Sequence, residues 1–200
     1  MEKGIALFIG TIFPCIFFVF FWHKLLNKKI EFKDYKIYSS ILIINTLDTI
    51  FILLTPQFLK IVGGVIILFI VNYIFFCKNI SKNLIMVLYS ELIIIISEFI
   101  FTLILALFMG DNLDIYATSF SGIIAINIGV TLVAFIITKF KFIYKMFNYL
   151  IKTFNNMKNS NLIMYFVITI VLVIIFSIII HMDLPLIFLL ICEAVLTIFI

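Results

Sequence analysis

Four carboxylic acids lie inside long apolar segments of this chain, where an ionised side chain is costly. They are Asp48, Glu91, Glu98 and Glu193. A carboxylate at the centre of a membrane-spanning helix costs about 2.5–3.5 kcal/mol on insertion scales, so each acid needs a structural or functional reason. Glu91 and Glu98 are seven residues apart, which places them two turns apart on one helical face, and Ser90 and Ser97 repeat the spacing. We expect this polar stripe to face protein rather than lipid.

Three roles are open for these acids. The first is an interhelical clamp, in which a buried Glu98 hydrogen-bonds a polar side chain such as Asn127, which lies mid-way along another apolar segment. The second is ligand recognition or signalling. The third, a proton or ion pathway, is least favoured, because such pathways use denser chains of ionisable residues with cationic partners. For Glu193 a structural hydrogen bond is the favoured interpretation.

No catalytic motif accompanies these acids. The phosphate-binding G-x-x-x-x-G-K-[ST], the zinc-binding H-E-x-x-H and the nucleophile motif G-x-S-x-G do not occur. Cys15, Cys77 and Cys192 are far apart and form no C-x-x-C pair, so they are interpreted as small packing residues. We therefore expect no enzyme activity, no metal and no cofactor in these 200 residues.

The elements that carry these side chains must be membrane helices. Hydrophobic residues make up 66% of the 200 residues and charged residues 12%, about half the share of a typical soluble domain. This composition excludes a soluble enzyme, and the net charge of +4 is too small for a nucleic-acid partner. All fourteen basic residues are Lys, which together with abundant Ile, Phe and Asn indicates an AT-rich, bacterial genome and a cell-membrane location.

Seven apolar segments are long and continuous enough to predict spanning helices, each needing about 20 residues. They give an all-α transmembrane bundle that forms a single domain over residues 1–200. The predicted spans are residues 5–22, 37–54, 61–76, 84–109, 115–137, 162–180 and 184–200.

The distribution of Lys predicts the orientation of the bundle. Residues 23–36, 77–83 and 138–161 hold twelve Lys, whereas the alternate connections and the N-terminus hold two. Since cytoplasmic connections are enriched in Lys, we expect the N-terminus outside and the C-terminus inside. Residues 138–161 also alternate Lys and apolar residues with a helical period, which predicts an amphipathic helix along the inner leaflet. It is either a topology-fixing loop or a lever between the fifth and sixth spans.

Small residues recur every four positions in the predicted fifth span. Ser121, Ala125 and Gly129, with Gly122 adjacent, allow another helix to approach closely. Packing within the chain is the favoured interpretation, and formation of a homodimer is the alternative.

Taken together, four features resemble the membrane sensor region of the peptide quorum-sensing receptor histidine kinases of the accessory-gene-regulator type. These are the Lys-rich connection 23–36, the short connection Lys78-Asn79-Ile80-Ser81-Lys82, the run 92–100 with its Ser97-Glu98 pair, and the basic segment Lys139-Phe140-Lys141. The resemblance covers the whole chain and is one of pattern. It implies that the bundle binds a secreted, often cyclic, peptide from outside and relays a conformational signal to a cytoplasmic kinase. The phospho-acceptor and ATP-binding parts of such a kinase are not in these residues.

On this interpretation, polar residues at the predicted outer side are candidate peptide contacts, and polar residues inside the spans are candidate coupling positions. The contacts are Asp48, Pro56, Gln57, Asp111, Asn112 and Asp114, and the coupling positions are Glu91, Glu98, Asn127 and Glu193. A small transporter or permease-like subunit and a structural or immunity-type membrane protein are the alternatives.

Overall fold

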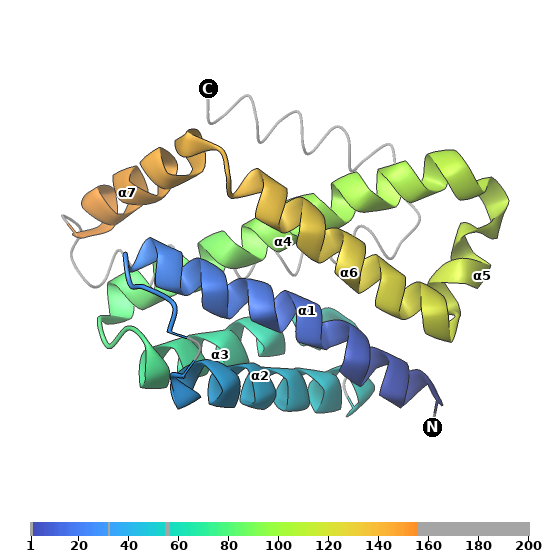
Figure 1. Cartoon of the computed structure of the whole chain (residues 1–200), viewed down its shortest axis with the longest axis horizontal. Coiled ribbons are helices and arrows are strands. Elements are labelled where there is room, and N and C mark those ends of the chain that lie inside the picture. The colour runs from blue at the N-terminus through green and yellow to red at the C-terminus, as the bar shows by residue number, and fades with distance from the viewer. Residues whose placement is uncertain (1, 32, 55–56, 156–200) are drawn as a thin grey trace.

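The computed structural model describes residues 2–31, 33–54 and 57–155, and all regular structure in those ranges is helical. Its elements are α1 (Glu2–Leu25), α2 (Tyr35–Leu54), α3 (Gln57–Phe75), α4 (Ile80–Met109), the 3-10 turn η1 (Gly110–Asn112), α5 (Leu113–Thr118), α6 (Phe120–Ile137) and α7 (Lys141–Asn155). Figure 1 shows the long helices running back and forth along one axis. The predicted spans 162–180 and 184–200 lie outside the described residues.

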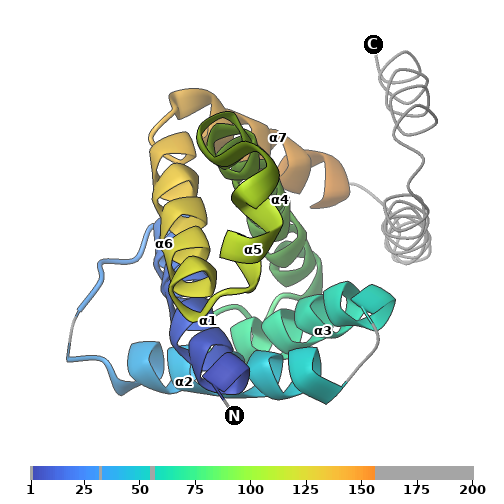
Figure 2. The ribbon, with the colours of Figure 1, turned by 90° about the vertical axis from the view of Figure 1, so that its right-hand side faces the viewer.

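Within the described ranges, four helices are long and apolar enough to cross a membrane. They are α1, α2, α4 and α6, while the apolar part of α3, Val62–Phe75, is shorter. This supports the prediction of a helical membrane protein. Neighbouring helices form a closed ring in the order α1, α2, α3, α4, α6, and α1 also contacts α4 across it. Figure 2 shows this ring along the bundle axis.

The predicted span 115–137 is wrong in one respect, because the chain breaks at Ser119 into α5 and α6. Ser119 adopts an extended conformation, with φ −74° and ψ 155°, and its Oγ accepts a hydrogen bond of 3.0 Å from the N–H of Gly122. This is a helix N-cap, which satisfies a backbone donor at the start of α6. Because the segment is apolar, its hydropathy does not reveal the start of α6, which Thr118-Ser119 encodes.

The connections α1–α2, α3–α4 and α6–α7 gather at one end of the bundle, which we call the lysine-rich end (Figure 1). Side chains join these connections to one another there. Lys28 Nζ donates to the carbonyl of Phe76 at 3.4 Å, and Lys24 Nζ donates to the carbonyl of Thr138, also at 3.4 Å. The N-terminus and the α4–α5 turn lie at the opposite end.

Helix α7 packs against α4 through the apolar stripe that the sequence predicts. Ile143 and Phe147 are buried, whereas Lys141, Lys145 and Lys152 are exposed. The hydroxyl of Tyr89 on α4 donates to the carbonyl of Ile143 at 2.7 Å. Within the described residues, Ile143 and Phe147 of this stripe are therefore covered by the bundle.

Small residues allow the helices of the ring to approach closely. A Cβ added at Gly129 would overlap the ring of Phe101 on α4, and one at Gly63 on α3 would overlap the ring of Phe51 on α2. At Gly122 the added atom would meet the backbone carbonyl of Tyr116 in α5. Two positions of the small-residue seam thus serve packing within the chain, as expected where apolar surface cannot drive helix association.

We predict that Gly122→Ala destabilises the protein, because its methyl group meets backbone that cannot rotate away. The expected loss in the free energy of unfolding is about 1–3 kcal/mol. The measurement is a fall in the temperature at which the detergent-solubilised protein loses its monodisperse chromatographic peak. Gly4→Ala is the matched control, since its nearest neighbour, Cδ1 of Leu53, would lie at 3.7 Å. Equal melting of the two variants would contradict the close contact between α5 and α6.

Candidate functional site

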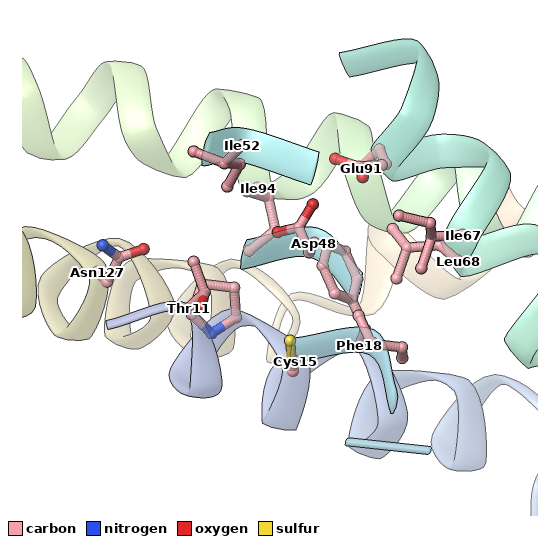
Figure 3. Close-up of a pocket in the computed structure, with 13 residues that line it drawn as sticks. Thr11, Cys15, Phe18, Asp48, Ile52, Ile67, Leu68, Glu91, Ile94 and Asn127 are labelled. Atoms are coloured by element: carbon pink, nitrogen blue, oxygen red, sulfur yellow. The ribbon is translucent and has the colours of Figure 1, made fainter. Parts of the chain in front are cut away.

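A cavity of about 190 Å³, lined mostly by apolar side chains and by two carboxyl groups, lies inside the helix ring (Figure 3). All five helices of the ring contribute to its lining. The lining residues that matter chemically are Thr11 and Cys15 from α1, Asp48 from α2, Gly64 from α3, Glu91 from α4 and Asn127 from α6. Figure 3 shows the carboxyl groups of Asp48 and Glu91 turned into this same space.

The two acids have apolar surroundings and share the cavity without a basic partner. Among the described residues that line the cavity there is no Lys, Arg or His; apolar side chains such as Phe18, Ile67 and Leu68 surround the carboxyl groups. A methyl group at Gly64 would lie 3.6 Å from Oδ1 of Asp48, so the glycine keeps space open beside that carboxyl. An intramembrane acid pair of this kind attracts a cationic or hydrogen-bond-donating group.

Helix position explains why these residues meet. Asp48 is 13 residues from the start of α2 and Glu91 is 11 residues from the start of α4, and both helices start at the lysine-rich end. At 1.5 Å per residue these acids lie about 20 Å and about 17 Å from that end. Asn127 is 10 residues from the end of α6, about 15 Å by the same measure.

Hydrogen bonds between α1 and α2 fix one wall of the cavity. Thr11 Oγ1 lies 2.7 Å from Oδ1 of Asn45 and 3.2 Å from Oγ1 of Thr49. The Asn45 amide in turn donates to the carbonyl of Phe8 at 3.1 Å. Thr11, Asn45 and Thr49 are all buried, so these bonds position α2, and with it Asp48, against α1.

Asn127 on α6 forms part of the opposite wall of the cavity. Its Nδ2 donates to the carbonyl of Ile123 in its own helix at 2.8 Å. A Cβ added at Gly10 of α1 would lie 3.0 Å from that same Nδ2, so the glycine admits the amide between α1 and α6. Asn127 therefore belongs with Asp48 and Glu91, and its amide bonds backbone in place of the predicted partner Glu98.

The polar stripe of α4 is divided between interior and surface. Ser90 and Ser97 are fully buried, with Ser90 Oγ accepting a hydrogen bond of 3.2 Å from Nε1 of Trp22. Glu91 lines the cavity, whereas Glu98 is exposed on the described part of the bundle. The expectation that the whole stripe faces protein is thus met by three of its residues within these ranges.

Of the other predicted contact residues, the structure describes the side chain of Asn112, which does not line the cavity. Asn112 is exposed and lines a separate, shallow hollow of about 460 Å³ at the α4–α5 turn, together with Phe108, Ile115 and Tyr116. The backbones of Gln57, Asp111 and Asp114 lie at the start of α3, in η1 and in α5. Pro56 and Glu193 lie outside the described residues.

The described residues offer no metal centre. In those ranges no three His, Cys, Asp or Glu side chains come together in a way that could hold an ion. Cys15 and Cys77 are buried free thiols, in agreement with their interpretation as packing residues.

Comparison with known proteins finds no matching family model, no matching curated protein and no matching solved structure.

We predict that Thr11→Val lowers the stability of the bundle, because it leaves the buried Oδ1 of Asn45 without its hydrogen-bond donor. The expected cost is about 1–3 kcal/mol, read as a lower unfolding temperature in detergent. Thr153→Val is the control, because that hydroxyl makes only an exposed bond to the carbonyl of Tyr149 in its own helix. If both variants unfold at the wild-type temperature, the Thr11 bonds do not hold α2 in place.

Proposed function

We propose that this chain is the membrane sensor module of a receptor, and that a cationic group of an extracellular peptide binds between Asp48 and Glu91. The observation that carries the proposal is the pair of carboxyl groups, from two different helices, that share one cavity without a basic partner among the described lining residues. The resemblance to peptide-sensing receptor kinases points to the same class of ligand.

The size of the cavity suits part of a ligand. A cavity of about 190 Å³ has room for an amino or guanidinium group with its adjoining methylenes. Asp48 is six residues from the end of α2 that faces away from the lysine-rich end, a depth of about 9 Å.

We infer the orientation from charge. With the lysine-rich end in the cytoplasm, the N-terminus and the α4–α5 turn face outward, in agreement with the positive-inside rule. Seven spans with a cytoplasmic C-terminus complete this proposal in a bacterial cell membrane, the last two spans lying outside the described residues.

Signal relay would use the contact between α4 and α7. Glu91 lies two residues after Tyr89, whose hydroxyl bonds the carbonyl of Ile143 in α7 at 2.7 Å. A ligand that favours one position of α4 therefore favours one position of α7 at the lysine-rich end, which is a shift between existing arrangements. In this proposal α7 is the lever that delivers the signal toward a cytoplasmic partner.

A transporter is the rival function that the same cavity favours, since transporters hold substrates between helices near the membrane midplane. It differs from a receptor in one measurable respect. A transporter moves the bound group across the membrane, whereas a sensor retains it and releases it to the same side.

The proposed orientation predicts how single cysteines react when they are introduced into a variant whose native cysteines are replaced by Ser. In intact cells an impermeant maleimide should modify Asn112→Cys and spare Lys29→Cys, because these two exposed residues lie at opposite ends of the bundle. Both should react after the membrane is permeabilised. Labelling of Lys29→Cys in intact cells would reverse the proposed orientation.

We predict that the cavity selects cations. Ile52→Cys, one turn from Asp48 on the cavity wall, should react faster with a trimethylammonium methanethiosulfonate than with its sulfonate counterpart. The ratio of the labelling rate with the cationic reagent to that with the anionic reagent should be at least about tenfold higher at Ile52→Cys than at Leu54→Cys, which lies at the exposed end of α2. Adding Asp48→Asn and Glu91→Gln should abolish this excess.

The same thiol separates receptor from transporter. The peptide fraction of medium in which the source cells have grown should slow the labelling of Ile52→Cys when Asp48 and Glu91 are intact. Vesicles containing the protein should not accumulate that fraction. Accumulation would favour the transporter, and an unchanged labelling rate would remove the support for a peptide ligand in this cavity.

A further inference from the structure

A second cavity, of about 300 Å³, lies at the lysine-rich end and differs in charge from the first. It lies between α1 and α6, where α6 gives way to the α6–α7 connection. The lining residues are Phe20, Phe21, Lys24, Lys28, Ile30, Phe135, Thr138 and Lys139. Three lysines thus surround one cavity, and no Asp or Glu appears among its described lining residues.

The cavity has a charged mouth and an apolar base. Lys24 and Lys139 lie within two residues of the ends of α1 and α6, at the level where a spanning helix meets the headgroups. Phe20, Phe21 and Phe135 lie about one turn deeper in the same helices, at the level of acyl chains. This layering matches a phospholipid, whose phosphate lies above its hydrocarbon.

The carboxyl ends of α1 and α6 meet at this cavity, and the three lysines supply positive charge there. Carbonyl groups at helix ends disfavour an anion. However, Lys24 Nζ donates to the Thr138 carbonyl and also lies 4.7 Å from the centre of the Tyr144 ring, which holds its side chain over the connection. Lys28 donates one hydrogen bond to the Phe76 carbonyl, and each ammonium group keeps further donors for a ligand.

The acids closest in sequence do not line this cavity. Glu31 and Asp34 follow Ile30 in the α1–α2 connection, but neither lines the cavity. The Asp34 carboxylate accepts a hydrogen bond from the backbone N–H of Lys36 at 3.0 Å.

We propose that this cavity binds the headgroup of an anionic phospholipid from the leaflet at the lysine-rich end. Basic pockets between spanning helices on the cytoplasmic side bind such headgroups, and each Lys near an anionic surface contributes roughly fivefold in affinity. The lipid phosphate lies among Lys24, Lys28 and Lys139, and its acyl chains run along Phe20 and Phe135. The bound lipid bridges α1 and α6. This proposal is independent of the peptide cavity, which lies deeper in the ring and is lined by acids.

The test is lipid binding to the purified full chain in a neutral detergent, measured by native mass spectrometry. The probes are phosphatidylglycerol, which is anionic, and phosphatidylcholine, which is zwitterionic. The wild type should retain one phosphatidylglycerol at a concentration at least about tenfold lower than it needs for phosphatidylcholine. The triple variant Lys24→Gln, Lys28→Gln, Lys139→Gln should lose that preference.

A matched variant separates the cavity from general charge. Lys33→Gln, Lys36→Gln, Lys78→Gln removes the same charge from exposed positions at the same end, so it should keep the preference. The triple replacement of Lys24, Lys28 and Lys139 by Arg keeps the charge and should also bind. Binding by the Arg variant would show that the Gln variant lost the site and not the fold.

Three outcomes would overturn the proposal. They are equal loss in the two Gln variants, an unchanged preference in the cavity variant, and displacement of the lipid by soluble glycerol 3-phosphate. The last would show that the cavity binds a free phosphate and not a lipid.

Discussion

The structure depends on one constraint, which is that polar side chains within an apolar bundle must find partners in the protein. Lipid offers no hydrogen bonds, so an unsatisfied hydroxyl or amide inside the membrane is costly. Thr11, Asn45 and Thr49 satisfy one another between α1 and α2, and Ser90 accepts from Trp22 between α4 and α1. These bonds join α1 to α2 and to α4, while the glycine contacts join α2 to α3, α4 to α6 and α1 to α6.

The buried side-chain amide of Asn72, which has no hydrogen-bond partner in the described part of the chain, is one exception to this constraint. Asp48 and Glu91 are in a different position, since they line a cavity. Their neighbours in the cavity are mostly apolar, and their carboxyl groups point into open space in place of a neighbouring helix. Two acids in one largely apolar cavity are the observation on which the proposed binding role rests, with the rest of the ring supplying a rigid frame around them.

Much of the fold was predictable because hydropathy and length determine which segments can become membrane helices. The predicted spans 5–22, 37–54 and 84–109 lie within α1, α2 and α4. Residues 115–137 were harder, because a single N-cap at Ser119 divides a segment whose hydropathy is continuous. The sequence identified Asp48, Glu91 and Asn127 separately, but it did not assign them to one site. Depth along each helix could have grouped them. The direction in which each side chain faces depends on helix rotation, and for α2 and α6 contacts with Thr11 and Gly10 of α1 contribute to it.

The length of α4 has a consequence for the membrane around the protein. Its 30 residues extend about 45 Å, and the apolar residues 84–109 that follow Lys82 and Asn83 extend about 39 Å, longer than a hydrocarbon layer of about 30 Å, whereas the 18 residues of α6 extend about 27 Å. Leu107 and Phe108, near the end of α4, are each 85% exposed in the described part of the chain. Such a hydrophobic mismatch is relieved by tilting the helix or by locally thickening the bilayer, so acyl-chain length becomes a variable that acts on α4 before it acts on its neighbours.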